Sequence, residues 1–138
     1  MNYPIITKKY HFCASHKYGN DAWSEEKNLE VFGKDYNTHG HNYVLEVSVT
    51  GPIDPGSGWL VDLPTLNKIV KSKVVDVLDH SQIEKDVEWF KDKQPSSEKS
   101  HEDIISRLAE LCSSRSALDR VISALRLEGV FISVVFAL

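Results

Sequence analysis

Two segments of alternating apolar and polar residues constrain the fold most, because together they bring three histidines to one place. Residues Ile5 to His16 are mostly apolar and aromatic, and residues His39 to Thr50 carry an apolar residue at nearly every second position. Side chains at positions i and i+2 of a strand point to the same side of a sheet. Two such faces are therefore predicted, one with Tyr10, Phe12, Ala14 and His16, the other with His39, His41, Tyr43, Leu45, Val47 and Val49.

The rest of the chain predicts helices and a second pair of strands. A polar excursion over residues 17–38 contains a short helical candidate, and the loop GPIDPGSG leads to a return strand that begins at residues 59–61. Apolar residues recur at helical spacing over 66–78 and again over 104–112. Residues 121–138 read as two short strands broken near a glycine. The order is ββααββ, which is an α+β fold with an antiparallel sheet.

Composition limits the classes of partner. A chain of 138 residues is expected to form one domain, residues 1–138, with a core that needs no disulfide. The net charge is −4 and no basic stripe interrupts the sequence, so no nucleic-acid partner is expected. The sequence shows neither a membrane-spanning apolar run nor a signal peptide, so we expect a cytoplasmic protein without a membrane partner. Cys13 and Cys112 form no Cys-x-x-Cys pair and are predicted to be core thiols.

The stretch His-Gly-His at residues 39–41 predicts a metal site. On a strand, His39 and His41 point to the same side and can present two imidazoles to one ion, while Gly40 leaves the opposite face open. A catalytic zinc site needs a third ligand and keeps one position free, and His16 at the end of the preceding strand is the candidate. The alternative is a turn with two partly exposed histidines, and the spacing alone leaves both possibilities open.

Two other stretches carry groups suited to acid–base chemistry or to binding. Asp79 stands beside His80 in LDH, where a carboxylate fixes the tautomer of an imidazole as a general base requires. The alternative is that His80 caps the last helical carbonyls. The stretch PSSE offers two hydroxyls and Glu98, which suit a heteroatom-rich ring or a helix cap.

The chain resembles the 6-pyruvoyl-tetrahydropterin synthase and 6-carboxy-tetrahydropterin synthase family over nearly its whole length. The resemblance lies in FCASH, SEEKNLEVFGK, HGHNYVLEV, GPIDPGSGWLVDL, VLDH, PSSE and LRLEG, in this order. It implies the tunnelling fold, in which an antiparallel sheet has two helices on one face. Such subunits form trimers that stack into a homo-hexamer, an oligomeric barrel with active sites at subunit interfaces.

The resemblance also implies roles for individual residues. His16, His39 and His41 match the Zn²⁺ ligands, and Asp79 and His80 match an acid/base dyad. Glu98 and Glu128 match positions that contact the pterin. Gly129 follows Glu128 where relatives usually have threonine or serine.

One position departs from the family pattern. Where the synthases have a cysteine that serves as a base, this chain has Asp35, four residues before His39. A carboxylate near Zn²⁺ stays ionised, so Asp35 is either a working base or a ligand that blocks the open metal position. Cys13 is predicted to point away from the face that carries His16, and it is not expected to replace the missing cysteine.

The resemblance implies a zinc-dependent carbon–oxygen lyase that acts on 7,8-dihydroneopterin triphosphate. Elimination of triphosphate with rearrangement of the side chain would give 6-pyruvoyl-tetrahydropterin for tetrahydrobiopterin biosynthesis. Cleavage of the side chain would give 6-hydroxymethyl-7,8-dihydropterin for folate biosynthesis, as in relatives that carry a glutamate in place of the cysteine. Two alternatives are a family member that binds pterin or metal without turnover, and a 6-carboxy-tetrahydropterin synthase of the deazapurine pathway. The second is less favoured because such enzymes usually keep the cysteine.

Overall fold

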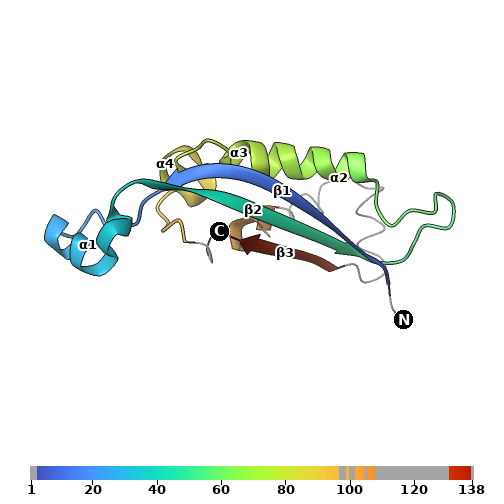
Figure 1. The fold of residues 1–138 in the computed structure, drawn as a ribbon, viewed down its shortest axis with the longest axis horizontal. Coiled ribbons are helices and arrows are strands. Elements are labelled where there is room, and N and C mark those ends of the chain that lie inside the picture. Colours follow the sequence, from blue (N-terminus) through green and yellow to red (C-terminus); the bar gives the residue numbers. More distant parts are fainter. Residues whose placement is uncertain (1–2, 97–98, 100–101, 105, 108–130, 138) are drawn as a thin grey trace.

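Three antiparallel strands form the sheet within the residues that the structure describes. A computed structural model describes residues 3–96, 99, 102–104 and 106–107, and the backbone of 131–137. Strand β1 (Ile5–His16) pairs with β2 (His39–Thr50) along its whole length, and β2 pairs with β3 (Phe131–Ala137). The bounds of β1 and β2 confirm the two predicted strands, and β3 confirms the last one. Figure 1 shows β1 and β2 as a long curved hairpin.

Helices connect and cover the strands. Helix α1 begins after Ser24, whose side chain accepts a hydrogen bond from the backbone N–H of Lys27, and α2 begins after Asp62, which caps the backbone N–H of Thr65. The helical elements are α1 (Glu25–Phe32), the 3-10 turn η1 (Gly33–Tyr36), α2 (Leu63–Val70), the π-turn η2 (Lys71–Val75), α3 (Asp76–Leu78), α4 (Ile83–Asp86) and the 3-10 turn η3 (Glu88–Phe90). The continuous run from α2 to α3 confirms the helix predicted over 66–78.

The core lies between one face of the hairpin and the helices. Buried strand residues on this face alternate with exposed or partly exposed ones, as the period of two predicted. Figure 1 shows α2 and α3 lying along the hairpin, and Leu66, Val70, Val74 and Leu78 are buried there. Leu45 is fully buried, so its replacement by alanine would cost about 2–5 kcal/mol. The same alternation carries His16 onto the core face at the end of β1.

After α3 the chain passes around the free edge of β1. His80 has a φ of 59°, a left-handed conformation that few residues other than glycine adopt. The backbone N–H of His80 donates to the carbonyl of Cys13 at 2.6 Å, and the N–H of Ser15 donates to the carbonyl of Ser81 at 2.9 Å. Ser15 and Gln82 form a parallel bridge. The turn therefore places residues 79–81 beside the face of β1 that points away from the core.

The return strand predicted at residues 59–61 is wrong. The backbone N–H of Asp54 donates to the carbonyl of Trp59 at 2.9 Å, and the Asp54 carboxylate accepts from the N–H groups of Gly56 and Ser57. The loop thus closes on itself, and the cap of α2 follows at Asp62. Too few residues remain between them for a paired strand. Most of the helix predicted over 104–112 and the strand predicted after 121 lie outside the described residues.

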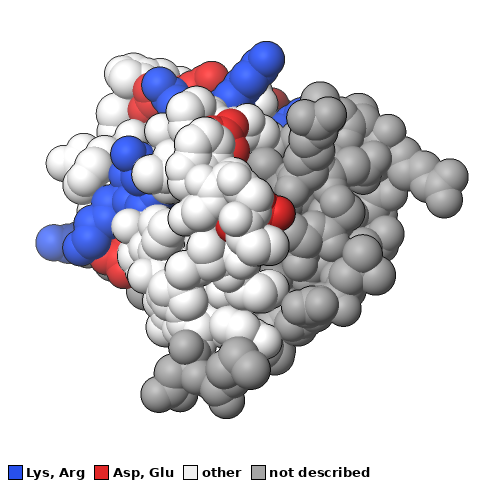
Figure 2. Space-filling view, turned by 90° about the vertical axis from the view of Figure 1, so that its right-hand side faces the viewer, with Lys and Arg blue, Asp and Glu red and all other residues white. Residues whose placement is uncertain are grey.

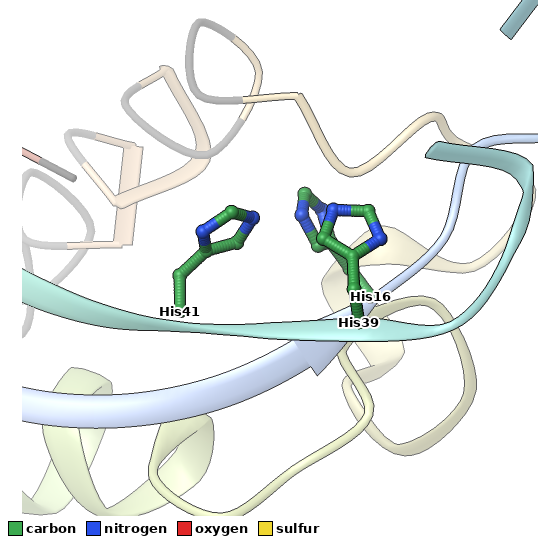
Figure 3. A group of neighbouring side chains, drawn as sticks. All are labelled: His16, His39 and His41. Carbon is green, nitrogen blue, oxygen red and sulfur yellow. The ribbon is translucent and has the colours of Figure 1, made fainter. Parts of the chain in front are cut away.

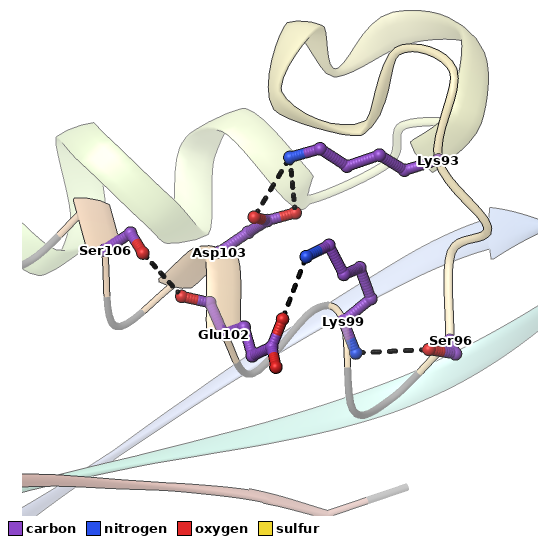
Figure 4. A network of polar contacts seen from close by, with 6 residues as sticks. All are labelled: Lys93, Ser96, Lys99, Glu102, Asp103 and Ser106. Carbon is purple, nitrogen blue, oxygen red and sulfur yellow. Dashed lines mark hydrogen bonds and ion pairs between the residues drawn. The ribbon is translucent and has the colours of Figure 1, made fainter.

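A polar network holds the loop that follows η3 (Figure 4). The Lys93 ammonium lies 3.1 Å from a carboxylate oxygen of Asp103, and the Ser96 hydroxyl accepts the backbone N–H of Lys99 at 3.1 Å. These contacts fix the loop on both sides of Pro95. That position matters because the Pro95 carbonyl contacts one of the histidines.

Charges of both signs mix on the surface. Figure 2 shows Lys or Arg side chains interspersed with Asp or Glu among the described residues of one end of the molecule. Within the part of the chain that the structure describes, no helix is long and apolar enough to cross a membrane.

Candidate active site

Three imidazoles meet where β1 ends and β2 begins. His16 is paired in register with His39, and His41 follows two residues later on the same face. One ring nitrogen of each lies within 4.8 Å of the others, and Figure 3 shows the three rings gathered on one side of the strands. Nitrogens bound to one Zn²⁺ at ~2.0–2.1 Å stand roughly 3.4 Å apart in a tetrahedral site. The structure therefore brings the three predicted ligands together at a spacing that small side-chain movements would close.

Hydrogen bonding selects the tautomer of His16. Its Nδ1 lies 2.9 Å from the Pro95 carbonyl, which can only accept, so Nδ1 carries the proton. The other nitrogen, Nε2, is buried and has no hydrogen-bond partner among the described residues. A buried polar atom without a partner costs about 1–3 kcal/mol. This lone pair, held among two other imidazoles, fits a metal ligand oriented by a carbonyl behind it.

Burial also keeps His16 neutral. The side chain is 4% exposed, and this burial lowers the pKa of His16 below its ordinary value. The hydrogen bond to Pro95 opposes the shift, while the neighbouring His39 and His41 add to it. A neutral imidazole is the form that binds a metal ion.

Asp35 lies at the edge of the histidine cluster. His39 Nδ1 is 2.8 Å from the carbonyl of Asn37 and so carries the proton there, while its Nε2 lies 3.9 Å from a carboxylate oxygen of Asp35. The Asp35 side chain is 61% exposed. The structure thus places this carboxylate beside the histidine cluster and open to solvent.

Contacts within the segment between β1 and β2, which contains α1 and η1, position Asp35. Asn28 is buried and binds Asn20 twice, accepting its N–H at 2.8 Å and donating to its carbonyl at 3.0 Å. The backbone N–H of Tyr18 donates to the carbonyl of Asp35 at 2.9 Å. Gly33, with a φ of 57°, allows the turn from α1 into η1 that carries Asp35.

Asp79 and His80 form a hydrogen-bonded pair. His80 Nδ1 lies 2.9 Å from Asp79 Oδ2, and the other oxygen, Oδ1, accepts the backbone N–H of Cys13 at 3.0 Å. The Cys13 N–H and the His80 ring lower the pKa of Asp79, so the carboxylate stays ionised. Because the Nδ1 proton is engaged, His80 offers a lone pair on Nε2, and its side chain is 79% exposed. This is the arrangement that a general base needs.

The pair lies on the face of β1 opposite the histidine cluster. An open pocket of about 360 Å³ is found there, lined by Cys13, Ala14, Ser15, Gly40, His41, Asn42, His80 and Ser81. Gly40 lies in this lining, as its predicted role of leaving the opposite face open requires. Within one chain, the cluster and the pair thus face opposite sides.

The structure corrects the prediction that Cys13 is a core thiol. Cys13 is only partly buried, and its sulfur lies 3.8 Å from His80 Nε2. The alternation along β1 correctly placed Cys13 opposite His16. No signal in the sequence showed that the chain after α3 returns to that face. Glu98, Glu128 and Cys112 lie outside the described residues, so the roles of the two glutamates stay predictions.

Comparisons with known proteins identify the family of the chain. The chain matches the profile of the 6-pyruvoyl tetrahydropterin synthase family over residues 5–126. It is 42% identical over 87 residues to a 6-pyruvoyl tetrahydrobiopterin synthase of Dictyostelium discoideum, covering 63% of this chain and 64% of that protein. It is 38% identical over 88 residues to the enzyme of the same name from Drosophila melanogaster, covering 62% and 52%. These matches span less than two thirds of either relative.

A solved structure matches more completely. The Caenorhabditis elegans 6-pyruvoyl tetrahydropterin synthase superposes with a TM-score of 0.71 at 32% sequence identity, over 99% of this chain and 96% of that one. The family profile covers all three clustered histidines, Asp35 and the Asp79–His80 pair. The chain therefore belongs to the 6-pyruvoyl tetrahydropterin synthase family.

Proposed function

We propose that this protein is a zinc-dependent carbon–oxygen lyase that acts on 7,8-dihydroneopterin triphosphate. The observation that carries the proposal is the cluster of three imidazoles with the buried, unpartnered Nε2 of His16, beside the carboxylate of Asp35. Relatives at 38–42% identity are named 6-pyruvoyl tetrahydrobiopterin synthase. Glu98 and Glu128 remain the proposed contacts of the pterin.

Different residues of the chain would bind the metal, orient its ligands and accept the proton. Zn²⁺ bound by His16, His39 and His41 supplies a Lewis acid that makes protons next to the substrate hydroxyls easier to remove. The carbonyls of Pro95 and Asn37 hold two of these imidazoles in the neutral tautomer that binds metal. Asp35 would accept a carbon-bound proton, and a cation held by the three histidines would keep this carboxylate ionised until the transfer.

The opposite orientation of the Asp79–His80 pair favours a site shared between copies of the chain. In one chain the pair cannot face a molecule bound at the histidine cluster, because the β1–β2 hairpin lies between them. We propose a homo-hexamer with the tunnelling fold, in which the pair of one subunit serves the metal of another. Light scattering at micromolar concentration should give a hexamer mass, and a monomer mass would refute this assembly.

We propose that the native protein favours cleavage of the side chain to 6-hydroxymethyl-7,8-dihydropterin. A carboxylate at residue 35 matches the relatives that carry a glutamate in place of the cysteine. Incubation with 7,8-dihydroneopterin triphosphate and identification of products by mass spectrometry tests both the reaction and the product. Release of 6-pyruvoyl-tetrahydropterin alone would keep the lyase and overturn the product.

A second candidate is a family member that binds metal and pterin without turnover. The 3.9 Å separation between Asp35 and His39 Nε2 favours it, because a carboxylate so close can take the open metal position. The same incubation separates the two candidates. Bound but unchanged substrate, together with gain of turnover in Asp35→Cys, would support the second.

A further inference from the structure

We propose that Cys13, His80 and Asp79 form a second reactive centre, an imidazole-activated thiol that takes small carbon electrophiles in the pocket opposite the histidine cluster. The proposal does not depend on the lyase reaction or on a bound metal. It rests on the order of the three side chains, on the way the backbone holds them and on the access that the pocket gives.

Two contacts place the three side chains in the order nucleophile, base and orienting carboxylate, and the Cys13 thiol also donates to Asp79 Oδ1 at 3.8 Å. Cys13 Sγ lies 3.8 Å from His80 Nε2, and His80 Nδ1 lies 2.9 Å from Asp79 Oδ2. Because Nδ1–H donates a hydrogen bond to Asp79, the lone pair of the ring is on Nε2, the nitrogen that faces the thiol. A thiol beside an oriented base is the arrangement that activates cysteine nucleophiles.

Backbone contacts hold the thiol and the base together. The Cys13 N–H donates to Asp79 Oδ1 at 3.0 Å, and the His80 N–H donates to the Cys13 carbonyl at 2.6 Å. His80 is kept in its left-handed conformation by these contacts. Such a conformation is strained in a residue with a side chain and is often retained at reactive sites.

The pocket gives a small molecule access to the sulfur. Its volume is about 360 Å³, and Ser15 and Asn42 line it together with the reactive groups. A Cβ added at Gly40 would lie 3.6 Å from the carbonyl of Ala14, which is an ordinary contact. The backbone would thus tolerate a Cβ at Gly40. The absence of a side chain there leaves space in the pocket. Hydroxyl and amide groups beside a thiol suit an uncharged electrophile with a carbonyl group.

The reaction needs no oxidant or added reductant. The thiol proton passes from Sγ to Nε2, and the sulfur forms a bond to the β-carbon of an activated alkene. The π electrons of the alkene move to the α-carbon, which takes the proton back from Nε2. The net result is addition of S–H across the double bond, with Asp79 stabilising the imidazolium in between.

N-ethylmaleimide, an activated alkene, tests the proposal on the full-length protein at neutral pH. Tryptic peptides separate Cys13, in YHFCASHK, from Cys112, in LAELCSSR, so mass spectrometry gives the rate at each. We expect Cys13 in the wild type to react at least about tenfold faster than Cys13 in His80→Gln. Asp79→Asn should give an intermediate rate. His11→Gln, which removes an imidazole from the same strand but not from this cluster, should match the wild type.

A second comparison needs no variant. Cys13 in the folded protein should react faster than Cys13 in urea-unfolded protein, although unfolding exposes the sulfur fully. Equal rates in wild type and His80→Gln, or a folded protein that reacts more slowly than the unfolded one, would overturn the proposal. Either result would leave the lyase proposal untouched, because the labelling requires no pterin.

Discussion

At the end of the β1–β2 hairpin, one face holds an imidazole that is 4% exposed and the other holds one whose side chain is 79% exposed. The first, His16, lies among two further histidines with a carbonyl behind it. The second, His80, lies beside a carboxylate and a thiol at an open pocket. Only the thickness of the strands separates them.

The difference shows how one strand can serve two kinds of chemistry. Burial favours the neutral form of His16, and its Nε2 has no hydrogen-bond partner among the described residues, which suits a metal ligand. Exposure lets His80 exchange protons, while Asp79 stays ionised to stabilise the charged ring. Successive residues of β1 point to opposite faces, so each face can be changed by mutation without touching the other.

Removing two histidines of the cluster formed by His16, His39 and His41 should have the largest effect on metal content and turnover. We expect about one zinc per chain in the wild type and none in the His39→Ala/His41→Ala double variant, because one imidazole cannot hold the ion. Turnover should fall on the order of 10⁴-fold or more, since a Lewis acid contributes several kcal/mol. Metal analysis and circular dichroism measure both. His11→Ala is the matched control and should keep its zinc, whereas full occupancy in the double variant would contradict the assignment.

Replacing His80, the proposed base on the opposite side of the hairpin, should strongly reduce turnover while the metal stays bound. We expect His80→Gln to lose about 10³-fold in turnover, within the range usual for general acid–base catalysis, at unchanged zinc content. A shared site adds a sharper test. Subunits of His80→Gln mixed with subunits of the double histidine variant should recover part of the activity. Some sites would then combine an intact histidine cluster from one subunit with an intact His80 from another. Mixed oligomers that stay inactive would show that each chain works alone.

The Asp35 carboxylate should matter less than either face. We expect Asp35→Asn to keep zinc and pterin binding but lose about 10²-fold in turnover, because an amide cannot accept the proton. Asp35→Cys should shift the products toward 6-pyruvoyl-tetrahydropterin. Unchanged turnover in Asp35→Asn, measured under the same conditions, would leave the proton transfer to His80 and Asp79.

The proximity of the three histidines could be predicted from the sequence because it depends on simple rules of strand geometry. Alternation along two strands placed His16, His39 and His41 on one side, and the antiparallel register brought the strand ends together. The arrangement of Cys13, Asp79 and His80 on the opposite side depends on a turn that no local sequence pattern predicts. His80 reaches Cys13 only because its backbone adopts a φ of 59° and rounds the edge of β1.

The segment at residues 59–61 was mispredicted for a similar reason. Its apolar residues favour a strand, but the preceding loop closes through the Asp54 carboxylate, and the cap of α2 follows immediately. The π-turn η2 within the α2–α3 run was likewise not foreseen, because the apolar stripe of a helix scarcely changes when one turn widens.

The smallest expected effect tests how well water is excluded from the face of the hairpin that carries the histidine cluster. Tyr43 lies on that face, stacked on Phe12 and 3% exposed, and burial raises its pKa to about 12, with smaller contributions from Tyr18 and Glu84. In the unfolded chain a tyrosine ionises near pH ~10, so between about pH 10 and 12 the unfolded state loses a proton that the folded state keeps. The free energy of unfolding should therefore fall with rising pH over this window, by at most about 2–3 kcal/mol. Urea unfolding of the wild type and Tyr43→Phe at a series of alkaline pH values measures the difference. Parallel curves for the two proteins would mean that water reaches Tyr43, and that the two faces differ less in burial than the structure indicates.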